Sequence, residues 1–169
     1  MEMLIRRPLP ADAPELAQLH VLTWRETYGH LLPSDFSGDA HLEMRQTMWE
    51  RILANPRPEW TVLTAAFGDE LVGFVSAGPG SESGTDSSSR QLYTLYVRSR
   101  WHGAGIGQAL FDAAVGHDAC VLWVAKENPR AIAFYRKNGF EFDGQEQADD
   151  AVPGIVEARM RRASRDATG

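Results

Sequence analysis

The 169-residue chain has a single cysteine, Cys120, and no long apolar run. One cysteine cannot form an internal disulfide, and no Cys/His cluster has the spacing of zinc ligands, so we predict no metal site. No apolar run approaches the ~18 residues that a membrane-spanning helix needs. The N-terminus lacks the apolar stretch of a secretory signal peptide. We therefore expect a cytoplasmic protein that has no membrane partner.

Positive charge is also scarce, since 17 Lys and Arg residues stand against 23 Asp and Glu. The formal charge of -6 argues against nucleic acid as a partner, because nucleic-acid binders present a basic face. With 43% hydrophobic residues, a chain of this length suits one compact domain with a substantial core. We predict a single domain over residues 1–162 and a disordered tail over residues 163–169.

Hydrophobic periodicity and turn residues divide the chain into helices and strands. Asp12 and Glu15 have the spacing of a capping box at the first helix, and Gly139 suits the left-handed position after the last helix. The order predicts an α/β fold, layered as α+β, in which a mixed sheet carries helices on both faces. We expect helices at 12–28, 43–54, 106–114 and 128–138, strands at 5–8, 61–67, 71–77, 93–98, 119–125, 140–145 and 155–161, and loops at 31–39 and 79–90.

Three alternating glycines, Gly103, Gly105 and Gly107, stand where a predicted strand leads into a helix. Glycine leaves no Cβ in the way of a ligand, and the free N–H groups at a helix start attract anions. An ATP-type phosphate loop is excluded because Gln108 follows Gly107 where Lys is needed. The dinucleotide pattern fits poorly, since its third glycine is displaced. This segment alone leaves a bare structural turn and a diphosphate site equally open.

A second segment, residues 128–140 (NPRAIAFYRKNGF), carries a more specific pattern. It resembles the second signature of the GNAT superfamily of acyl-CoA-dependent N-acyltransferases, Asn-x-x-Ala-x-x-Phe-Tyr-x-x-x-Gly-Phe. The glycine segment resembles that superfamily's first signature, Arg/Gln-x-x-Gly-x-Gly/Ala, except that His102 stands at its first position. The order and separation of the two signatures match, and residues 91–140 carry the resemblance most strongly.

The resemblance implies a mostly antiparallel, six- to seven-stranded sheet with splayed central strands, and an N-acetyltransferase that uses acetyl-CoA. The acetyl group would pass to a primary amine, on a small molecule or a peptide, by direct attack in a ternary complex. The Val97 N–H would polarise the thioester carbonyl. The fourth strand, near Leu95–Val97, would pair with the pantetheine arm through main-chain hydrogen bonds. The implied cofactor-binding residues are Leu95, Tyr96, Val97, His102, Gly103, Ala104, Gly105, Ile106, Gly107, Gln108, Asn128 and Tyr135.

Tyr135 is the candidate general acid. A phenol with a pKa near 10 can protonate a leaving thiolate while it stays neutral at pH 7. Asn128 lies seven residues earlier, on nearly the same helix face, and also suits the helix cap. Periodicity alone favours a core tyrosine, and the surrounding motif favours the catalytic interpretation.

The general base stays unassigned. Many relatives carry Glu where this chain has Gln91, an amide that cannot accept the proton; Glu26 and a water relay are alternatives. Four aromatic residues are candidates for the wall of an acceptor pocket: Trp24, Tyr28, Trp49 and Trp60. The first three suit ordinary helix packing equally well. The candidate acceptor-binding residues are Trp24, Glu26, Tyr28 and Gln91.

Other reactive side chains favour structural interpretations. We interpret Cys120 as a small buried hydrophobe, and His20 and His30 as surface or capping residues. We interpret Glu82 and Asp86 as solvated charges. The pair Asp149-Asp150 suits a solvated turn, and attraction of a cationic substrate is the alternative. Because Gln91 and His102 depart from the family pattern, the alternative function is a non-catalytic acyl-CoA-binding or regulatory module. The resemblance also leaves a homodimer open.

Overall fold

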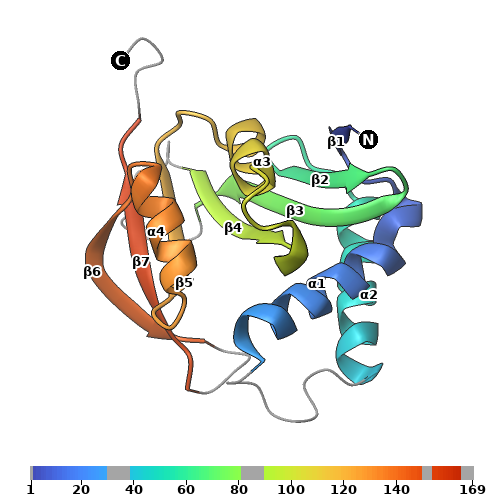
Figure 1. The fold of residues 1–169 in the computed structure, drawn as a ribbon, viewed down its shortest axis with the longest axis horizontal. Coiled ribbons are helices and arrows are strands. Elements are labelled where there is room, and N and C mark those ends of the chain that lie inside the picture. The colour runs from blue at the N-terminus through green and yellow to red at the C-terminus, as the bar shows by residue number, and fades with distance from the viewer. Residues whose placement is uncertain (1, 30–38, 81–89, 150–153, 165–169) are drawn as a thin grey trace. The chain divides into compact units, whose positions relative to one another are not determined.

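A computed structural model describes residues 2–29, 39–80, 90–149 and 154–164. Its strands are β1 (Met3–Arg6), β2 (Thr61–Phe67), β3 (Glu70–Pro79), β4 (Arg90–Val97), β5 (Cys120–Ala125), β6 (Glu141–Ala148) and β7 (Val156–Arg162). Its α-helices are α1 (Ala13–Tyr28), α2 (Asp39–Ala54), α3 (Ile106–Ala114) and α4 (Pro129–Lys137), and its 3₁₀ turns are η1 (Pro10–Asp12) and η2 (Ser99–Trp101) (Figure 1).

The strands form one sheet of seven in the order β1-β2-β3-β4-β5-β7-β6. Strands β4 and β5 are parallel, from Arg90 opposite Cys120 to Leu92 opposite Leu122. The pairs β1–β2, β5–β7 and β6–β7 are antiparallel. The predicted mixed, mostly antiparallel sheet of six to seven strands is therefore confirmed. The splay of its central strands stays a prediction.

The chain forms two compact units, the first from Met1–Ser76 and Thr94–Ala114 and the second from Ala77–Tyr93 and Val115–Gly169. The prediction of a single domain is not tested by this division. In the first unit α1 and α2 lie side by side (Figure 1). Their apolar faces share a core with the sheet in which Leu16, Trp49 and Phe74 are fully buried.

The prediction of a capping box at the start of α1 is wrong. Asp12 has helical backbone angles, and its side chain makes no cap bond to α1. Its Oδ2 accepts from the N–H of Leu9 at 2.7 Å and pairs with Arg6 at 2.8 Å. Glu15 Oε1 accepts from the N–H of Leu71, which lies on β3, at 3.1 Å. The reason is that η1 precedes the helix and moves the free N–H groups upstream.

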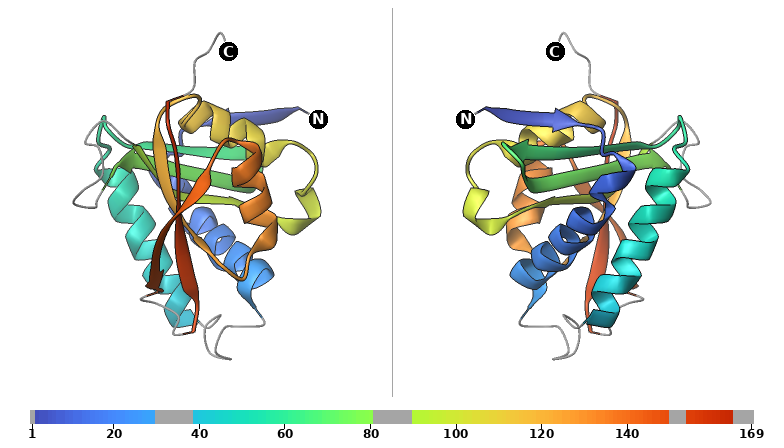
Figure 2. Two further views of the ribbon diagram at one scale, coloured as in Figure 1. Left: turned by 90° about the vertical axis from the view of Figure 1, so that its left-hand side faces the viewer. Right: turned by 90° about the vertical axis from the view of Figure 1, so that its right-hand side faces the viewer.

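In the second unit α4 covers one face of β5 and β7 (Figure 2). The helix ends as predicted: Gly139 has a φ of +91°, its N–H donates to Arg136 O, and the Phe140 N–H donates to Tyr135 O. These two bonds make a Schellman motif. The apolar strand β5 lies between β4 and β7 with most of its side chains buried, as its composition predicts.

Several element boundaries differ from the expectations. Helix α2 begins at Asp39, four residues early, where an acidic residue favours the first turn. Strand β4 begins at Arg90 and β6 extends to Ala148. Predictions that fall on His30, Glu82, Asp86, Asp150 and residues 165–169 lie outside the described residues.

None of the helices in the described part of the chain is both long and apolar enough to cross a membrane. Nor do the described ranges contain a group of three or more His, Cys, Asp or Glu side chains that could hold a metal ion.

Candidate functional site

The glycine turn before α3 exposes backbone. Gly103 and Gly105 have φ values of +85° and +83°, which favour glycine, and a Cβ built on either would meet no atom within 4 Å. Helix α3 starts directly afterwards at Ile106. The first N–H groups of a helix have no acceptor inside it and carry the positive end of its dipole. This backbone is therefore open to the approach of an anionic group.

Residues 98–102, between β4 and the glycine turn, contact β2, β3 and the end of β4. The Arg98 N–H donates to Val72 O on β3 at 2.9 Å. The Trp101 ring stacks on Phe67 of β2, with centroids 4.4 Å apart. The His102 Nε2 lies 2.9 Å from Val97 O. The side chain of His102, the residue that departs from the first signature, therefore points back to the end of β4.

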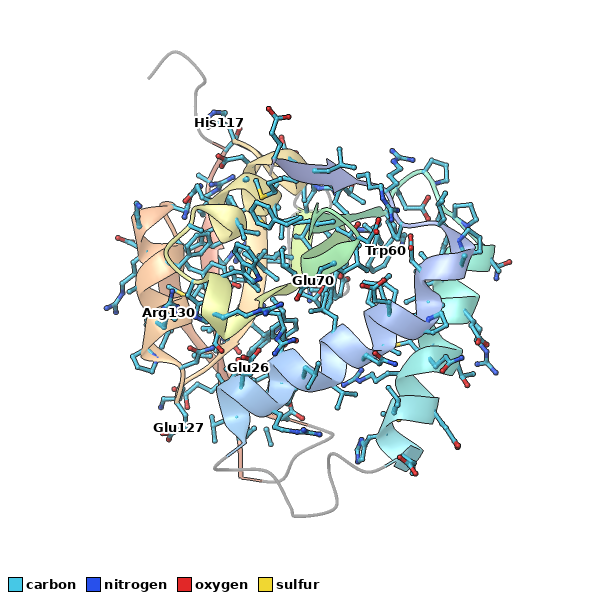
Figure 3. All side chains as sticks on the ribbon, turned by 45° about the vertical axis from the view of Figure 1, so that its right-hand side comes forward. Glu26, Trp60, Glu70, His117, Glu127 and Arg130 are labelled. Carbon is cyan, nitrogen blue, oxygen red and sulfur yellow. The ribbon has the colours of Figure 1, made fainter. Side chains whose placement is uncertain are left out.

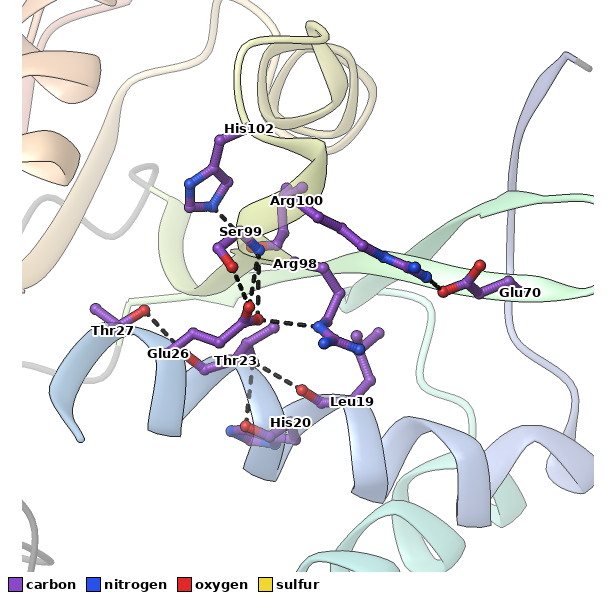
Figure 4. A network of polar contacts seen from close by, with 11 residues as sticks. Leu19, His20, Thr23, Glu26, Thr27, Glu70, Arg98, Ser99, Arg100 and His102 are labelled. Atoms are coloured by element: carbon purple, nitrogen blue, oxygen red, sulfur yellow. Dashed lines mark hydrogen bonds and ion pairs between the residues drawn. The ribbon is translucent and has the colours of Figure 1, made fainter.

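Glu26, in the last turn of α1, meets this same segment (Figures 3 and 4). Its Oε1 accepts from Arg98 Nε at 3.0 Å, and both carboxylate oxygens accept from the Ser99 N–H at 3.2 and 3.3 Å. The Ser99 hydroxyl donates to Oε2. Burial opposes the charge, but these bonds outweigh it, so the pKa of Glu26 is lowered.

His20 lies inside an aromatic cluster, not on the surface, so that expectation is wrong. The Trp49 Nε1 donates to His20 Nδ1 at 3.3 Å, and the imidazole lies 5.1 Å from the Phe74 ring and 5.8 Å from the Tyr96 ring. Burial lowers the pKa of His20 to about 3, and the charge of Arg45 adds to the effect. The imidazole is therefore neutral at physiological pH.

The aromatic residues proposed for an acceptor pocket differ in their surroundings. The Trp24 ring, half-buried on α1, lies 4.8 Å from Tyr28 and 6.4 Å from Tyr96. Trp49 is buried and packs against Phe74, which is a core role. Trp60 precedes β2 and is half-buried (Figure 3).

The second unit carries the remaining predicted residues. Asn128 caps α4 as expected, its Oδ1 accepting from the Ala131 N–H at 3.2 Å. Tyr135 is buried between the rings of Phe134 and Phe140, with centroids 5.5 and 5.8 Å away. Gln91 is buried in β4.

Cys120 is buried, as its strand composition predicts. Burial raises the pKa of its thiol to about 11, so it stays protonated at neutral pH. This protonation state does not suit a nucleophile, because the thiolate is the reactive form.

The structure gathers the candidates into two sets. The first unit holds residues 95–97, the turn at 102–108 and the α1 residues Trp24, Glu26 and Tyr28, while the second unit holds Gln91, Asn128 and Tyr135. Sequence reasoning missed Arg98 and Ser99 as partners of Glu26. The available signal was their position between two predicted binding segments.

Comparison with known proteins gives the family. The model of the acetyltransferase (GNAT) family matches residues 16–140. The probable N-acetyltransferase Rv2775 of Mycobacterium tuberculosis is 28% identical over 147 residues, covering 83% of this chain and 81% of the relative. The uncharacterized N-acetyltransferase YuaI of Bacillus subtilis is 27% identical over 143 residues, with coverage of 78% and 76%.

A solved structure shares the fold along nearly the whole chain. It is the PaiA N-acetyltransferase of Thermoplasma acidophilum in complex with coenzyme A. The TM-score is 0.76 at 20% identity, over 96% of this chain and 99% of that one. At this identity the likeness establishes the fold, and the matched family model establishes the relationship.

Proposed function

Because the chain belongs to the acetyltransferase (GNAT) family, we propose that it transfers an acetyl group from acetyl-CoA to a primary amine. Enzymes of this family acetylate amine acceptors with acyl-CoA as the donor. The neutral amine attacks the thioester carbonyl of acetyl-CoA directly while both substrates are bound. The C–N bond forms as the C–S bond breaks, the coenzyme A thiolate leaves, and the proton lost by the amine nitrogen passes to solvent.

The observation that carries the proposal is the open glycine turn at the N-terminus of α3. The positive φ values of Gly103 and Gly105 and the space above them suit close approach of a diphosphate to the backbone. The backbone of residues 102–108 holds the diphosphate. Its binding does not depend on the side chain at the first signature position, which here is His102.

Two groups of this chain have proposed chemical roles. The Val97 N–H donates to the acetyl carbonyl oxygen and stabilises the negative charge that develops there. The Tyr135 hydroxyl holds the proton that the displaced thiolate takes, since a phenol is neutral at pH 7 and can still donate. Leu95, Tyr96 and Asn128 contact the cofactor arm.

Thiol release from acetyl-CoA, measured against a panel of amines, tests the proposal. The panel covers small amines, polyamines, amino sugars, amino acids and peptides with a free N-terminus. Turnover with at least one class is expected. Coenzyme A binding without turnover on any amine supports the alternative, a non-catalytic acyl-CoA-binding module, and stronger thermal protection by NAD than by coenzyme A excludes both.

A glycine pair provides the matched test of the diphosphate site. Gly105→Glu places a carboxylate where the diphosphate binds, and we expect it to abolish coenzyme A binding in calorimetry. Gly144→Glu is the control, because Gly144 also has a positive φ, +91°, with no atom near a built Cβ, but lies in β6. Equal affinities of the two variants would exclude the glycine turn as the site.

A further inference from the structure

We propose that Glu26 is a positioning residue, whose carboxylate holds Arg98 and Ser99 against α1 and so orients the cofactor-binding backbone on either side of them. This inference rests on the proposed function, because the oriented groups are the Val97 N–H and the glycine turn. It assigns Glu26 a role other than that of the missing base.

Both oxygens of the Glu26 carboxylate accept hydrogen bonds from Arg98 and Ser99. Oε1 accepts from Arg98 Nε and the Ser99 N–H, and Oε2 accepts from the Ser99 N–H and hydroxyl (Figure 4). The single Ser99 N–H is shared between the two oxygens, so three donor hydrogens engage most of the roughly four lone-pair directions of the carboxylate. Two of the three donor groups belong to one residue, Ser99, which fixes both its backbone and its side chain.

The bonds between Glu26 and Ser99 affect the cofactor site because of where Ser99 lies in the chain. Ser99 opens η2, two residues after Val97 and three before His102. Its carbonyl accepts from the His102 N–H at 3.1 Å, which leads into the glycine turn. A rotation of Ser99 would therefore displace both the proposed carbonyl donor and the proposed diphosphate turn.

Other contacts hold the segment from its remaining sides. Arg98 is bonded to Val72 on β3, Trp101 stacks on Phe67 of β2, and Arg100 pairs with Glu70 at the start of β3. The partners in these three contacts all lie on β2 or β3. Glu26 supplies the link to α1, the helix that carries the candidate acceptor residues Trp24 and Tyr28.

Electrostatics favours the same role. The bonds from Ser99 and Arg98 keep the pKa of Glu26 below its ordinary value in spite of partial burial. A carboxylate stabilised in its charged form is a weak base toward an ammonium group with a pKa near 10. The same bonds hold Arg98 and Ser99 against the Glu26 carboxylate.

Coenzyme A binding by calorimetry is the primary test, because it does not depend on turnover. We expect Glu26→Gln to weaken the Kd about tenfold, the loss that corresponds to one bond to a charged group, about 1.4 kcal/mol. Glu50→Gln is the control, since Glu50 is exposed on α2 and bonded to Gln46; its Kd should equal that of the wild type.

Ser99→Ala tests the same contact from the other side and preserves the charge of Glu26. We expect a smaller loss of affinity, about threefold, and a double variant no weaker than Glu26→Gln, because both changes remove one interaction. Fully additive losses, or an unchanged Kd in both single variants, would overturn the inference. Ser99→Ala also keeps the test decisive if Glu26→Gln does not fold.

The pH profile of kcat/KM separates positioning from proton abstraction. If Glu26 only positions, the Gln variant keeps the acidic limb of the wild-type profile at the same midpoint, with a raised KM for acetyl-CoA and a smaller change in kcat. Loss of that limb would identify Glu26 as the base and refute the positioning role. Failure of the wild type to bind coenzyme A would instead refute the proposed function.

Discussion

Among single residues, His20 shows how an ionisable group can become a core packing residue. Its imidazole lies 6.1 Å from Trp49 and 5.1 Å from Phe74, between α1, α2 and β3. The Nδ1 accepts from the indole of Trp49, so the neutral ring with its proton on Nε2 is the form that fits. The residue resembles a polar core side chain more than a surface histidine.

The burial of His20 predicts a pH-dependent stability. An unfolded histidine binds a proton near pH 6.5, whereas His20 in the folded chain has a pKa of about 3. The unfolded state therefore binds more protons between these values, and folding stability falls as the pH decreases from 6.5 toward 3. We expect a loss of about 2 kcal/mol between pH 7 and pH 5, measured by urea unfolding.

His20→Asn is the matched variant, because its amide oxygen can still accept from Trp49 but does not titrate. The loss of stability between pH 7 and pH 5 should largely disappear in this variant. An unchanged pH dependence would show that other groups cause it.

Tyr135 provides the residue-scale test of the proposed acid. Tyr135→Phe keeps the ring packing against Phe134 and Phe140 and removes the hydroxyl. We expect kcat to fall roughly 100-fold, with a much smaller change in the KM for acetyl-CoA, because proton transfer affects the chemical step. Tyr93→Phe, which removes a hydroxyl bonded to Pro79 O, is the control. A decrease of less than about twofold would exclude Tyr135 as the acid.

At the scale of elements, the close approach of β3 to β4 depends on Gly73. A Cβ at Gly73 would lie 2.9 Å from Tyr96 O and 3.2 Å from Val97 Cγ2. It would also lie 3.2 Å from Leu110 Cδ1 on α3. At Gly73, β3 therefore packs tightly against Tyr96 and Val97, two residues proposed to bind the cofactor arm, and against Leu110 of α3.

Gly73→Ala should therefore destabilise the protein. The Cβ meets a backbone oxygen that cannot rotate away, so β4 must shift, and we expect the free energy of unfolding to fall by roughly 1–3 kcal/mol. Gly144→Ala, which meets only the strain of a positive φ, is the comparison. An unfolding midpoint in denaturant equal to that of the wild type would show that β4 accommodates the methyl group at Gly73.

The elements themselves were largely predictable, because their signals are local. Short, mainly apolar runs on either side of Gly68-Asp69 define β2 and β3, and Asn128-Pro129 and Gly139 mark the two ends of α4. The start of α1 was not, since Asp12 bonds to Leu9 and Arg6 instead of capping the helix. A cap residue can bond in either direction, and the preceding chain decides which.

At the scale of the whole molecule, the last strand joins segments that are far apart in the chain. Arg162, at the end of β7, is buried and donates to the carbonyl oxygens of Gly116, Asp118 and Asn138. Its guanidinium also lies 5.3 Å from the Phe140 ring. One side chain thus fixes the entry to β5 and the end of α4.

Arg162→Ala should destabilise the protein strongly. Three carbonyl groups, of which that of Asn138 is buried and the others partly buried, would lose a charged donor, and we expect the free energy of unfolding to decrease by roughly 2–4 kcal/mol. Arg161→Ala is the control, because the neighbouring side chain points to the opposite face of the strand and should change stability by less than about 0.5 kcal/mol. Similar unfolding midpoints for both variants would contradict this role of Arg162.

The sequence by itself determined the order of helices and strands, the glycine turn and the cap of α4, because each depends on neighbours a few residues apart. The tertiary structure decided which distant groups meet: His20 bonds to Trp49, 29 residues away, and Glu26 to Arg98, 72 residues away. Burial of the imidazole and the bonds to the carboxylate follow from those contacts. They make His20 a neutral core residue and keep the pKa of Glu26 below its ordinary value.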